Sequence, residues 1–410
     1  LENKIGKMFR AADVTGPMSL KLQLDVPLAN PDKTTVDGVI KFNDALLNLV
    51  PWHLQLKQLT GQVHFTQDDT DAKNITGILF NKPISFDLST QRKATPTSVV
   101  RASMVNKIDV SDIVNWLKLP VKNEITGAAD FAINIDFAAD QPINVMLASK
   151  LVGITLNLPG EFAKPAAQAR DIAAQILLQD NQPVKIKLNY ANQFNVALIL
   201  DRLNEKFTLN AANVLLGAGD PVWPPASGLY ITGDFDVLDT DKIKSYTDKM
   251  NGNSTSSTLP LKSIDIRAKL LSLSGIQINN VRVQATPVKN NWNVSITSQD
   301  VNGQLQVPAA FTQQGKIKAN FQRLNLRSAP DTSKSSPFQL NLKTLPAIEI
   351  TASNFSFNAM PFGQVVFNTV PAGAGASIRQ FRISSPRLDL QASGDWTQKG
   401  TRLQGTATSQ

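Results

Sequence analysis

The chain has 410 residues, of which 42% are hydrophobic and 18% are charged. This composition excludes a disordered chain, because it supplies enough apolar side chains for a sizeable core. The net charge of +8 is spread along the chain without any block of like charges, whereas nucleic-acid binding needs a concentrated basic face. There are no cysteines and only two histidines, which excludes disulfides, thiolate catalysis and cysteine-bound metals.

No segment has the features of a membrane span or a signal peptide. The longest apolar stretches are far shorter than the roughly 18 residues that a spanning helix needs. The chain begins at Leu1 without an initiator methionine. We therefore expect it to be part of a longer polypeptide, with any targeting or anchoring segment outside it.

Apolar and polar residues alternate with a period of two along almost the whole chain. Residues 18–26, 131–137, 184–190 and 194–200 show this most clearly. Successive side chains of a strand point to opposite faces, so each segment has one apolar and one polar face. Antiparallel sheets with one wetted side have this pattern, and parallel sheets covered on both sides do not. The sequence therefore predicts a mainly β protein.

A glycine recurs two residues after an apolar residue, and the alternation resumes beyond it. Residues 36–38, 59–61, 125–127 and 301–303 are examples. Glycine in a strand marks a bulge, a tight bend or a close approach of another chain segment. The pattern occurs too often for a single ligand-binding loop, so it indicates a repeated structural unit.

Two longer blocks resemble each other and start 86 residues apart, at Leu259 and Leu345. Each starts with Leu-Pro and continues through matching alternating segments. Self-similarity at a fixed spacing favours stacked or laterally added units over independent globular domains. The predicted segments are 1–150, with a short helix near 110–119; 151–258, with a short helix near 240–250; and 259–410, with two related four-strand blocks at 259–326 and 345–405.

No pattern typical of an active site or a metal centre occurs. His53 and His64 have no acidic residue at a metal-ligand spacing, so we interpret them as ordinary strand or surface residues. The acidic cluster at 68–71 lacks the glycine and the glutamate of a calcium-binding loop. There is no Gly-x-Ser-x-Gly motif for a serine nucleophile. The sequence therefore predicts no enzymatic activity, no metal and no cofactor.

The apolar strand faces must be buried against something, and alternation leaves three arrangements open. They face one another in a sandwich or barrel, or they fill the interior of a solenoid. The third arrangement is an incompletely closed sheet whose apolar concave face is covered by a ligand. Acyl chains suit such a face, because they need no hydrogen-bond partner and gain about 0.8 kcal/mol per buried methylene.

Several segments resemble the YhdP family of AsmA-like proteins. They are the motif GITLNLP at 153–159 followed by Lys164, residues 217–239, the two Leu-Pro blocks and residues 382–396. The similarity covers most of residues 18–405. It implies an elongated, twisted antiparallel β-sheet that forms a groove, with a few short helices. It also implies a periplasmic location in Gram-negative bacteria, as part of an inner-membrane-anchored protein whose anchor lies outside this chain.

The leading hypothesis is a non-enzymatic conduit that carries phospholipids between the inner and outer membranes. Its partners are the acyl chains of phospholipids, the two membranes through regions outside this chain, and envelope proteins that the sequence does not identify. The alternative is a closed β-solenoid or sandwich that serves as an envelope scaffold or adhesin without binding lipid. The predicted groove-lining residues are Leu156, Leu158, Val184, Ile186, Leu188, Val196, Leu198, Leu200, Ile264, Ile266, Val281 and Val283.

Overall fold

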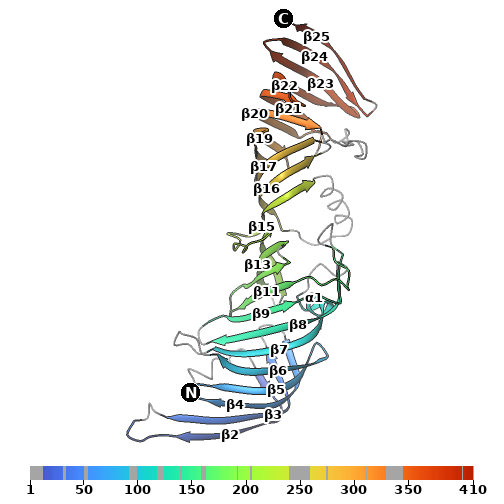
Figure 1. Ribbon diagram of the computed structural model, residues 1–410. Helices are drawn as coiled ribbons and strands as arrows, with labels where there is room; N and C mark the ends of the chain where they lie inside the picture. Colours follow the sequence, from blue (N-terminus) through green and yellow to red (C-terminus); the bar gives the residue numbers. More distant parts are fainter. Residues whose placement is uncertain are drawn as a thin grey trace. The chain divides into compact units, whose positions relative to one another are not determined.

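The computed structural model shows a chain that is almost entirely β-strand, which confirms the predicted fold class. Its strands form two compact units (Figure 1). Unit 1 comprises Leu1–Ala212 and Ala218–Ser227, and unit 2 comprises Asn213–Gly217 and Gly228–Gln410. The structure describes residues 13–30, 34–49, 54–91, 99–117, 124–138, 141–157, 163–191, 193–203, 206–239, 259–273, 276–310, 312–328, 345–398 and 400–409.

The strands of unit 1 form an antiparallel sheet in which neighbours in the chain are mostly neighbours in space. Pairing runs in order from β2 to β9 and from β11 to β13, and β9 pairs directly with β11. The short β10 pairs instead with the beginning of β8. The elements are β1 (Asp13–Thr15), β2 (Met18–Asp25), β3 (Thr35–Leu49), β4 (Leu54–Thr66), β5 (Thr70–Leu79), β6 (Lys82–Gln91), β7 (Val99–Asp109), α1 (Val110–Leu117), β8 (Ile125–Ala138), β9 (Ile143–Ser149), β10 (Ile154–Leu156), β11 (Ile172–Leu178), β12 (Val184–Tyr190), β13 (Phe194–Leu203) and β14 (Lys206–Leu216), whose last residues belong to unit 2.

Unit 2 is also antiparallel, apart from two parallel pairs, β15–β16 and β20–β21. β16 and β21 are the first strands of the two blocks that the sequence shows to be related, so each block starts at a parallel pair. The strands are β15 (Gly228–Asp239), β16 (Leu261–Leu273), β17 (Ile276–Val288), β18 (Asn291–Thr297), β19 (Val301–Pro308), β20 (Lys316–Ser328), β21 (Ala347–Phe357), β22 (Met360–Ala372), β23 (Gly375–Ser385), β24 (Leu388–Thr397) and β25 (Gly400–Ser409).

In the residues that the structure describes, each block contains five strands, β16–β20 and β21–β25, where the sequence predicted four. The last strand of each block was missed. In β20 the pairing register with β19 shifts, so its apolar residues change from odd positions, such as Phe321, to even positions, such as Leu324. In β25 the only large apolar residue is Leu403. Both features hide the period of two.

The predicted helix near 110–119 corresponds to α1. Its N-terminus is capped by Asp109, whose Oδ1 accepts a hydrogen bond of 3.0 Å from the backbone N–H of Ser111, as is common at helix starts. The second predicted helix, near 240–250, lies outside the described residues. In the part of the chain that the structure describes, no helix is long and apolar enough to cross a membrane.

The hydrophobic core lies on one face of each sheet and not between two layers. In unit 2 the largest cluster of buried residues runs from Leu238 on β15 to Ile383 on β23. Among the described residues, the extensive contacts between strands of unit 2 all join hydrogen-bonded neighbours. The described part of unit 2 is therefore a single layer with one apolar face, unlike a sandwich.

Two glycines of the recurring pattern make room for an aromatic ring on this face. Gly38 lies directly opposite Phe65 on the next strand, and Gly303 lies opposite Phe321. A side chain at Gly38 would meet the ring of Phe65, with Cε1 only 2.6 Å from the added Cβ. Here the glycine allows the close approach of a side chain, which is one of the roles expected from the sequence.

Candidate functional site

The apolar face of unit 2 is continuous across all of its strands. Residues that pair in register from β15 to β25 form two adjacent rows at right angles to the strands, and every member of both rows is apolar or glycine. The first row is Gly233, Ile266, Val283, Ile296, Gly303, Phe321, Ala352, Val365, Ile383, Leu390 and Ala407. The second row is Ile231, Ile264, Ala285, Val294, Leu305, Ala319, Ile350, Phe367, Phe381, Ala392 and Gly405.

The opposite face of unit 2 is polar in the same registers. Between the two apolar rows lies a row whose only apolar member is Val366. It consists of Thr232, Asp265, Gln284, Ser295, Gln304, Asn320, Thr351, Val366, Arg382, Gln391 and Thr406. The two faces therefore differ sharply in chemistry, although they are only the thickness of one sheet apart.

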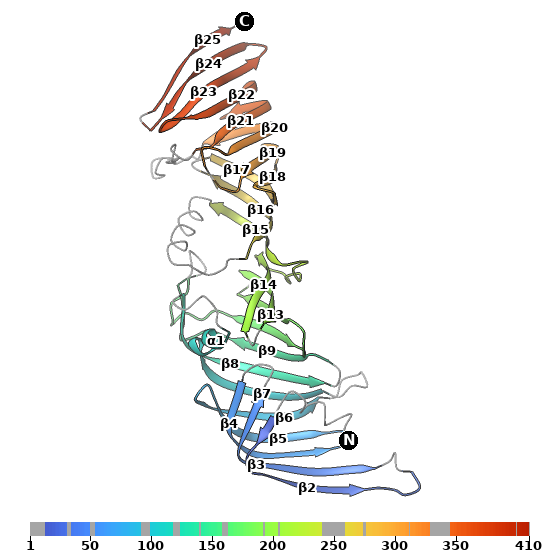
Figure 2. The same ribbon diagram turned by 180° about the vertical axis from the view of Figure 1, so that it is seen from behind.

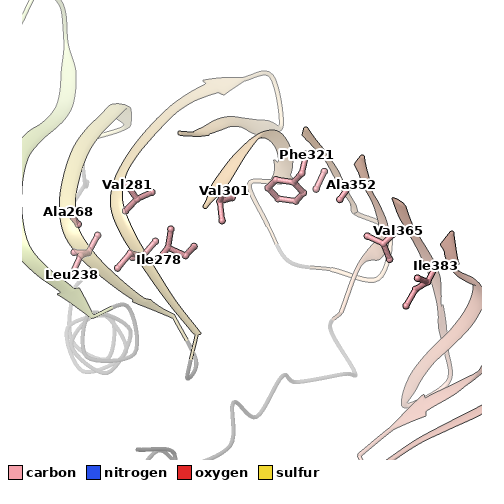
Figure 3. Packing of buried hydrophobic residues seen from close by; sticks show 11 residues of the cluster. Leu238, Ala268, Ile278, Val281, Val301, Phe321, Ala352, Val365 and Ile383 are labelled. Carbon is pink, nitrogen blue, oxygen red and sulfur yellow. The ribbon is translucent and has the colours of Figure 1, made fainter. Parts of the chain in front are cut away.

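The sheet of unit 2 bends so that its apolar side chains lie on the inner side of an arc. Figure 3 shows nine of them in sequence, from Leu238 and Ala268 through Val301 to Ile383. Bending brings these side chains close to one another, which buries them without a second layer. Ile266, Val283 and Ile296 stay half-buried. A half-buried apolar surface that follows a concave face is suited to an elongated apolar ligand.

Unit 1 has a matching apolar row. It crosses eight strands from β5 to β13 and consists of Ala72, Leu88, Ala102, Ile135, Val145, Ile176, Ile186 and Leu198. On the other face a polar row crosses six strands and consists of His64, Asp71, Ser89, Arg101, Asp136 and Asn144. The same separation of faces is thus present in both units.

Ten of the predicted lining residues lie on these apolar faces. Six form three directly opposed pairs between β12 and β13, which are Val184 with Leu200, Ile186 with Leu198, and Leu188 with Val196. In unit 2, Ile266 lies opposite Val283, Ile264 opposite Ala285, and Val281 opposite Ala268. Which of them touch a ligand stays a prediction, because burial against neighbours explains the same residue types.

Leu156, another predicted lining residue, belongs to a short strand outside these rows. Leu156 lies on β10 and is buried in a small cluster with Ile154, Leu151 and Tyr190, against which Leu188 of β12 packs. Its alternation looks like that of the other strands, but β10 pairs with the first residues of β8, and Leu156 also forms a bridge with Lys164. Leu158 lies outside the described residues.

The buried side chain of Lys164 binds the backbone of this small cluster. Its side chain is 1% exposed, and its Nζ donates hydrogen bonds to the carbonyl oxygens of Ile154 (2.6 Å) and Pro165 (3.1 Å). Burial and the nearby charge of Arg170 lower the pKa of Lys164. The position is structural, since a buried cation needs such hydrogen bonds.

The apolar face is most open at β2, the first long strand of the sheet. Met18, Leu20, Leu22 and Leu24 are 42–60% exposed. In register they lie opposite Phe42, Ile40, Gly38 and Val36 of β3, so they belong to the same face. Large apolar side chains with this exposure form a surface that a ligand can reach directly.

Charged groups on the polar faces are paired with one another. His64 lies between Asp71 and Asp37, with Nδ1 3.2 Å from an oxygen of Asp71 and Nε2 3.3 Å from an oxygen of Asp37. These hydrogen bonds, with the one to Asp71 the stronger cause, raise the pKa of His64. In unit 2 the bidentate contact with Arg282 lowers the pKa of Asp265.

The charged side chains also line a cavity of about 460 Å³ on β15–β17. Each of its two acidic residues faces a basic one, with Asp236 2.7 Å from Lys269 and Asp234 3.7 Å from Arg267. Across the described residues, no group of three or more histidine or acidic side chains is placed to hold a metal ion. His53 lies outside the described residues, and His64 is a surface strand residue as predicted.

Sequence reasoning missed one group on the apolar side of unit 1. Trp116 on α1 contacts Phe80 from the turn between β5 and β6, and it also contacts Phe207 at the start of β14. These residues are up to 127 positions apart, so no local pattern connects them. The only signal was the aromatic residue at the end of a short predicted helix.

Comparisons with known proteins point to one family. A family model described as YhdP protein matches residues 1–410. The chain is similar to the Intermembrane phospholipid transporter YhdP of Escherichia coli (strain K12), with 23% identity over 420 residues. The alignment covers 97% of this chain and 32% of the relative, so the chain spans about a third of the relative's length. No solved structure gives a significant match.

Proposed function

Because the chain belongs to the YhdP family, we propose that it is a segment of a non-enzymatic phospholipid conduit in the bacterial cell envelope. Acyl chains lie along the apolar face of the sheet, and the polar face meets the aqueous periplasm. The name of the Escherichia coli relative, an intermembrane phospholipid transporter, supports this assignment.

The observation that carries the proposal is the uninterrupted apolar register in unit 2. A conduit needs an apolar surface without gaps, because each polar side chain on the path would have to lose water without gaining a hydrogen bond. Both rows cross eleven strands, and neither contains a charged or hydrogen-bonding side chain. A closed solenoid also stacks apolar residues into a continuous core, but it leaves none of them partly exposed along a row, whereas Ile266, Val283 and Ile296 are half-buried.

Movement along this face is supported by the kind of contacts that it offers. Acyl chains on a hydrocarbon surface gain free energy in proportion to the area buried, without directional bonds. A chain that shifts from Ile266 to Val283 exchanges one apolar neighbour for another. The free energy therefore changes little along a row, and a lipid slides without being trapped.

The test introduces the same charge on either face of one strand. Ile296 of β18 lies in the first apolar row, and the next residue, Thr297, is exposed on the opposite face. Ile296→Glu and Thr297→Glu are therefore matched variants. Each is expressed in a Gram-negative host and purified, and bound phospholipid is measured by native mass spectrometry and lipid extraction. We expect bound phospholipid in the parent protein and in Thr297→Glu, and its loss in Ile296→Glu.

A second pair of variants places the charge at an exposed position, where it does not unfold the sheet. Leu20 is 60% exposed, so Leu20→Glu leaves the fold intact, and Ser19→Glu on the other face is its control. We expect Leu20→Glu to reduce uptake of a fluorescent phospholipid and Ser19→Glu to leave it unchanged. A parent protein that is free of lipid and takes up no fluorescent phospholipid has a closed core, and it would be assigned to the scaffold class.

A further inference from the structure

Helix α1 is attached to unit 1 at its base by ion pairs. Nζ of Lys82, at the start of β6, lies 2.7 Å from a carboxylate oxygen of Asp112 and 3.7 Å from one of Asp109. Val114 is buried, and α1 makes extensive contacts only with β7 and β8 among the described elements. The beginning of the helix is therefore fixed at the end of β7.

The other end of α1 carries Trp116, which lies between two aromatic rings from distant strands. The ring centroids of Trp116 and Phe80 are 6.3 Å apart, and those of Trp116 and Phe207 are 6.1 Å apart. Phe80 belongs to the turn between β5 and β6, whereas Phe207 is the second residue of β14. Figure 2 shows α1 beside the beginning of β14, as this contact requires.

This aromatic group crosses the apolar face of unit 1. Phe207 packs against the cluster formed by Val184, Ile186 and Leu200, which lie on the apolar side of β12 and β13. In pairing order, β6 and β13 are separated by β7, β8, β9, β11 and β12. A contact that joins Phe80 to Phe207 therefore passes over the face on which the apolar row of these strands lies.

We propose that Trp116 is a gate on the acyl-chain path of unit 1, an inference that rests on the proposed lipid conduit. An acyl chain that moves along the row from Leu88 to Leu198 has to contact the indole ring and displace it from Phe207. Phe80 and Phe207 offer Trp116 apolar ring surface, and an acyl chain offers the same kind of surface in place of Phe207. The ion pairs of Lys82 keep the helix attached while its tip moves.

A second tryptophan in unit 1 supplies an internal reference. Trp223 lies on the opposite face, with its ring centroid 5.3 Å from Nζ of Lys187 and 5.9 Å from Nζ of Lys185. These lysines alternate along β12 with Val184 and Ile186, which point to the apolar side. A lipid on the apolar face touches Trp116 and does not touch Trp223.

The experiment uses fluorescence quenching by bromine atoms in the acyl chains. Two variants keep a single tryptophan, either Trp116 or Trp223, with the other four tryptophans of the chain replaced by phenylalanine. Each protein is loaded with phosphatidylglycerol whose acyl chains carry bromine, or with the same lipid without bromine. We expect the brominated lipid to quench most of the emission of Trp116 and to leave the emission of Trp223 unchanged.

Lipid binding is measured on the same samples by native mass spectrometry, so the two proposals can fail separately. Bound brominated lipid without quenching of Trp116 would refute the gate and leave the conduit standing. An absence of bound lipid would refute both. As a second test, Trp116→Ala should take up fluorescent phospholipid faster than the parent protein, with the same amount bound at equilibrium, whereas Trp223→Ala should match the parent. Equal rates in all three proteins would also overturn the gate.

Discussion

Replacing Gly38 by alanine should destabilise unit 1 only while the ring of Phe65 is present. The two residues are opposite each other on β3 and β4. A Cβ at Gly38 would lie 2.6 and 2.7 Å from Cε1 and Cε2 of Phe65, and still closer to Cζ, with no backbone atom among its three nearest neighbours. The backbone at Gly38 has no positive φ. The cost of the added methyl group therefore comes from one side chain.

The magnitudes follow from these contacts. Overpacking by one methyl group costs about 1–3 kcal/mol, and Phe65→Ala, at a position 8% exposed, costs about 3 kcal/mol or more. In the Phe65→Ala background the clash is gone, and alanine is better than glycine within a strand by about 0.5 kcal/mol. The second substitution should then be neutral or stabilising, which gives a coupling energy of about 2 kcal/mol.

The assay is urea denaturation of the parent, both single variants and the double variant, followed by circular dichroism. Gly38→Ala combined with Phe321→Ala serves as the control, because Phe321 belongs to the other unit and packs within that unit's own core, so these effects should add. If the changes in unfolding free energy caused by Gly38→Ala and Phe65→Ala also add, the ring of Phe65 is not the reason why position 38 needs glycine. The explanation of the glycine pattern would then be wrong.

Three further predictions concern the two faces of unit 1. Ile186→Asp should reduce bound phospholipid, measured by lipid extraction, more than Lys185→Asp, and equal losses would contradict the assignment of faces. His64 should stabilise the fold fully below pH 6.5, the pKa of the unfolded side chain, and this contribution should fall as the pH rises through its raised pKa; thermal melts against His64→Gln test it, and a difference that grows with pH would refute it. Arg101→Met should lower the free energy of unfolding by about 3 kcal/mol, since it leaves the buried Asp136 carboxylate without its cation. Adding Asp136→Leu should recover most of this loss, measured by urea denaturation. No recovery would mean that the loss comes from packing and not from the unpaired charge.

Strand faces could be predicted from the sequence because side-chain alternation is a local property. Val184, Ile186 and Leu188 alternate with polar residues, and the structure places them on one face of β12. Leu156 shows where this reasoning stops. It alternates in the same way, but β10 pairs with the first residues of β8. The choice of this partner depends on residues far away in the chain, so alternation cannot predict it.

Features that depend on distant partners were not predictable. The alternation around Gly38 could not identify Phe65 as the ring that occupies the space, since bulges and bends also select glycine. The last strand of each block was hidden, in β20 by a shift of register and in β25 by small residues. Trp116 and Phe207 meet although they lie 91 positions apart in the chain, so no single segment encodes their contact.

Site-specific photo-crosslinking in the full-length protein tests the central claim most directly. A photoreactive amino acid is placed in living Gram-negative cells at Ile186 or Ile296 on the apolar rows, or at their neighbours Lys185 or Thr297 on the polar face. The proposed conduit predicts phospholipid adducts at both apolar positions and none at the polar ones. Adducts at all four positions, or at none, would contradict the assignment of the apolar face as the path of the lipid.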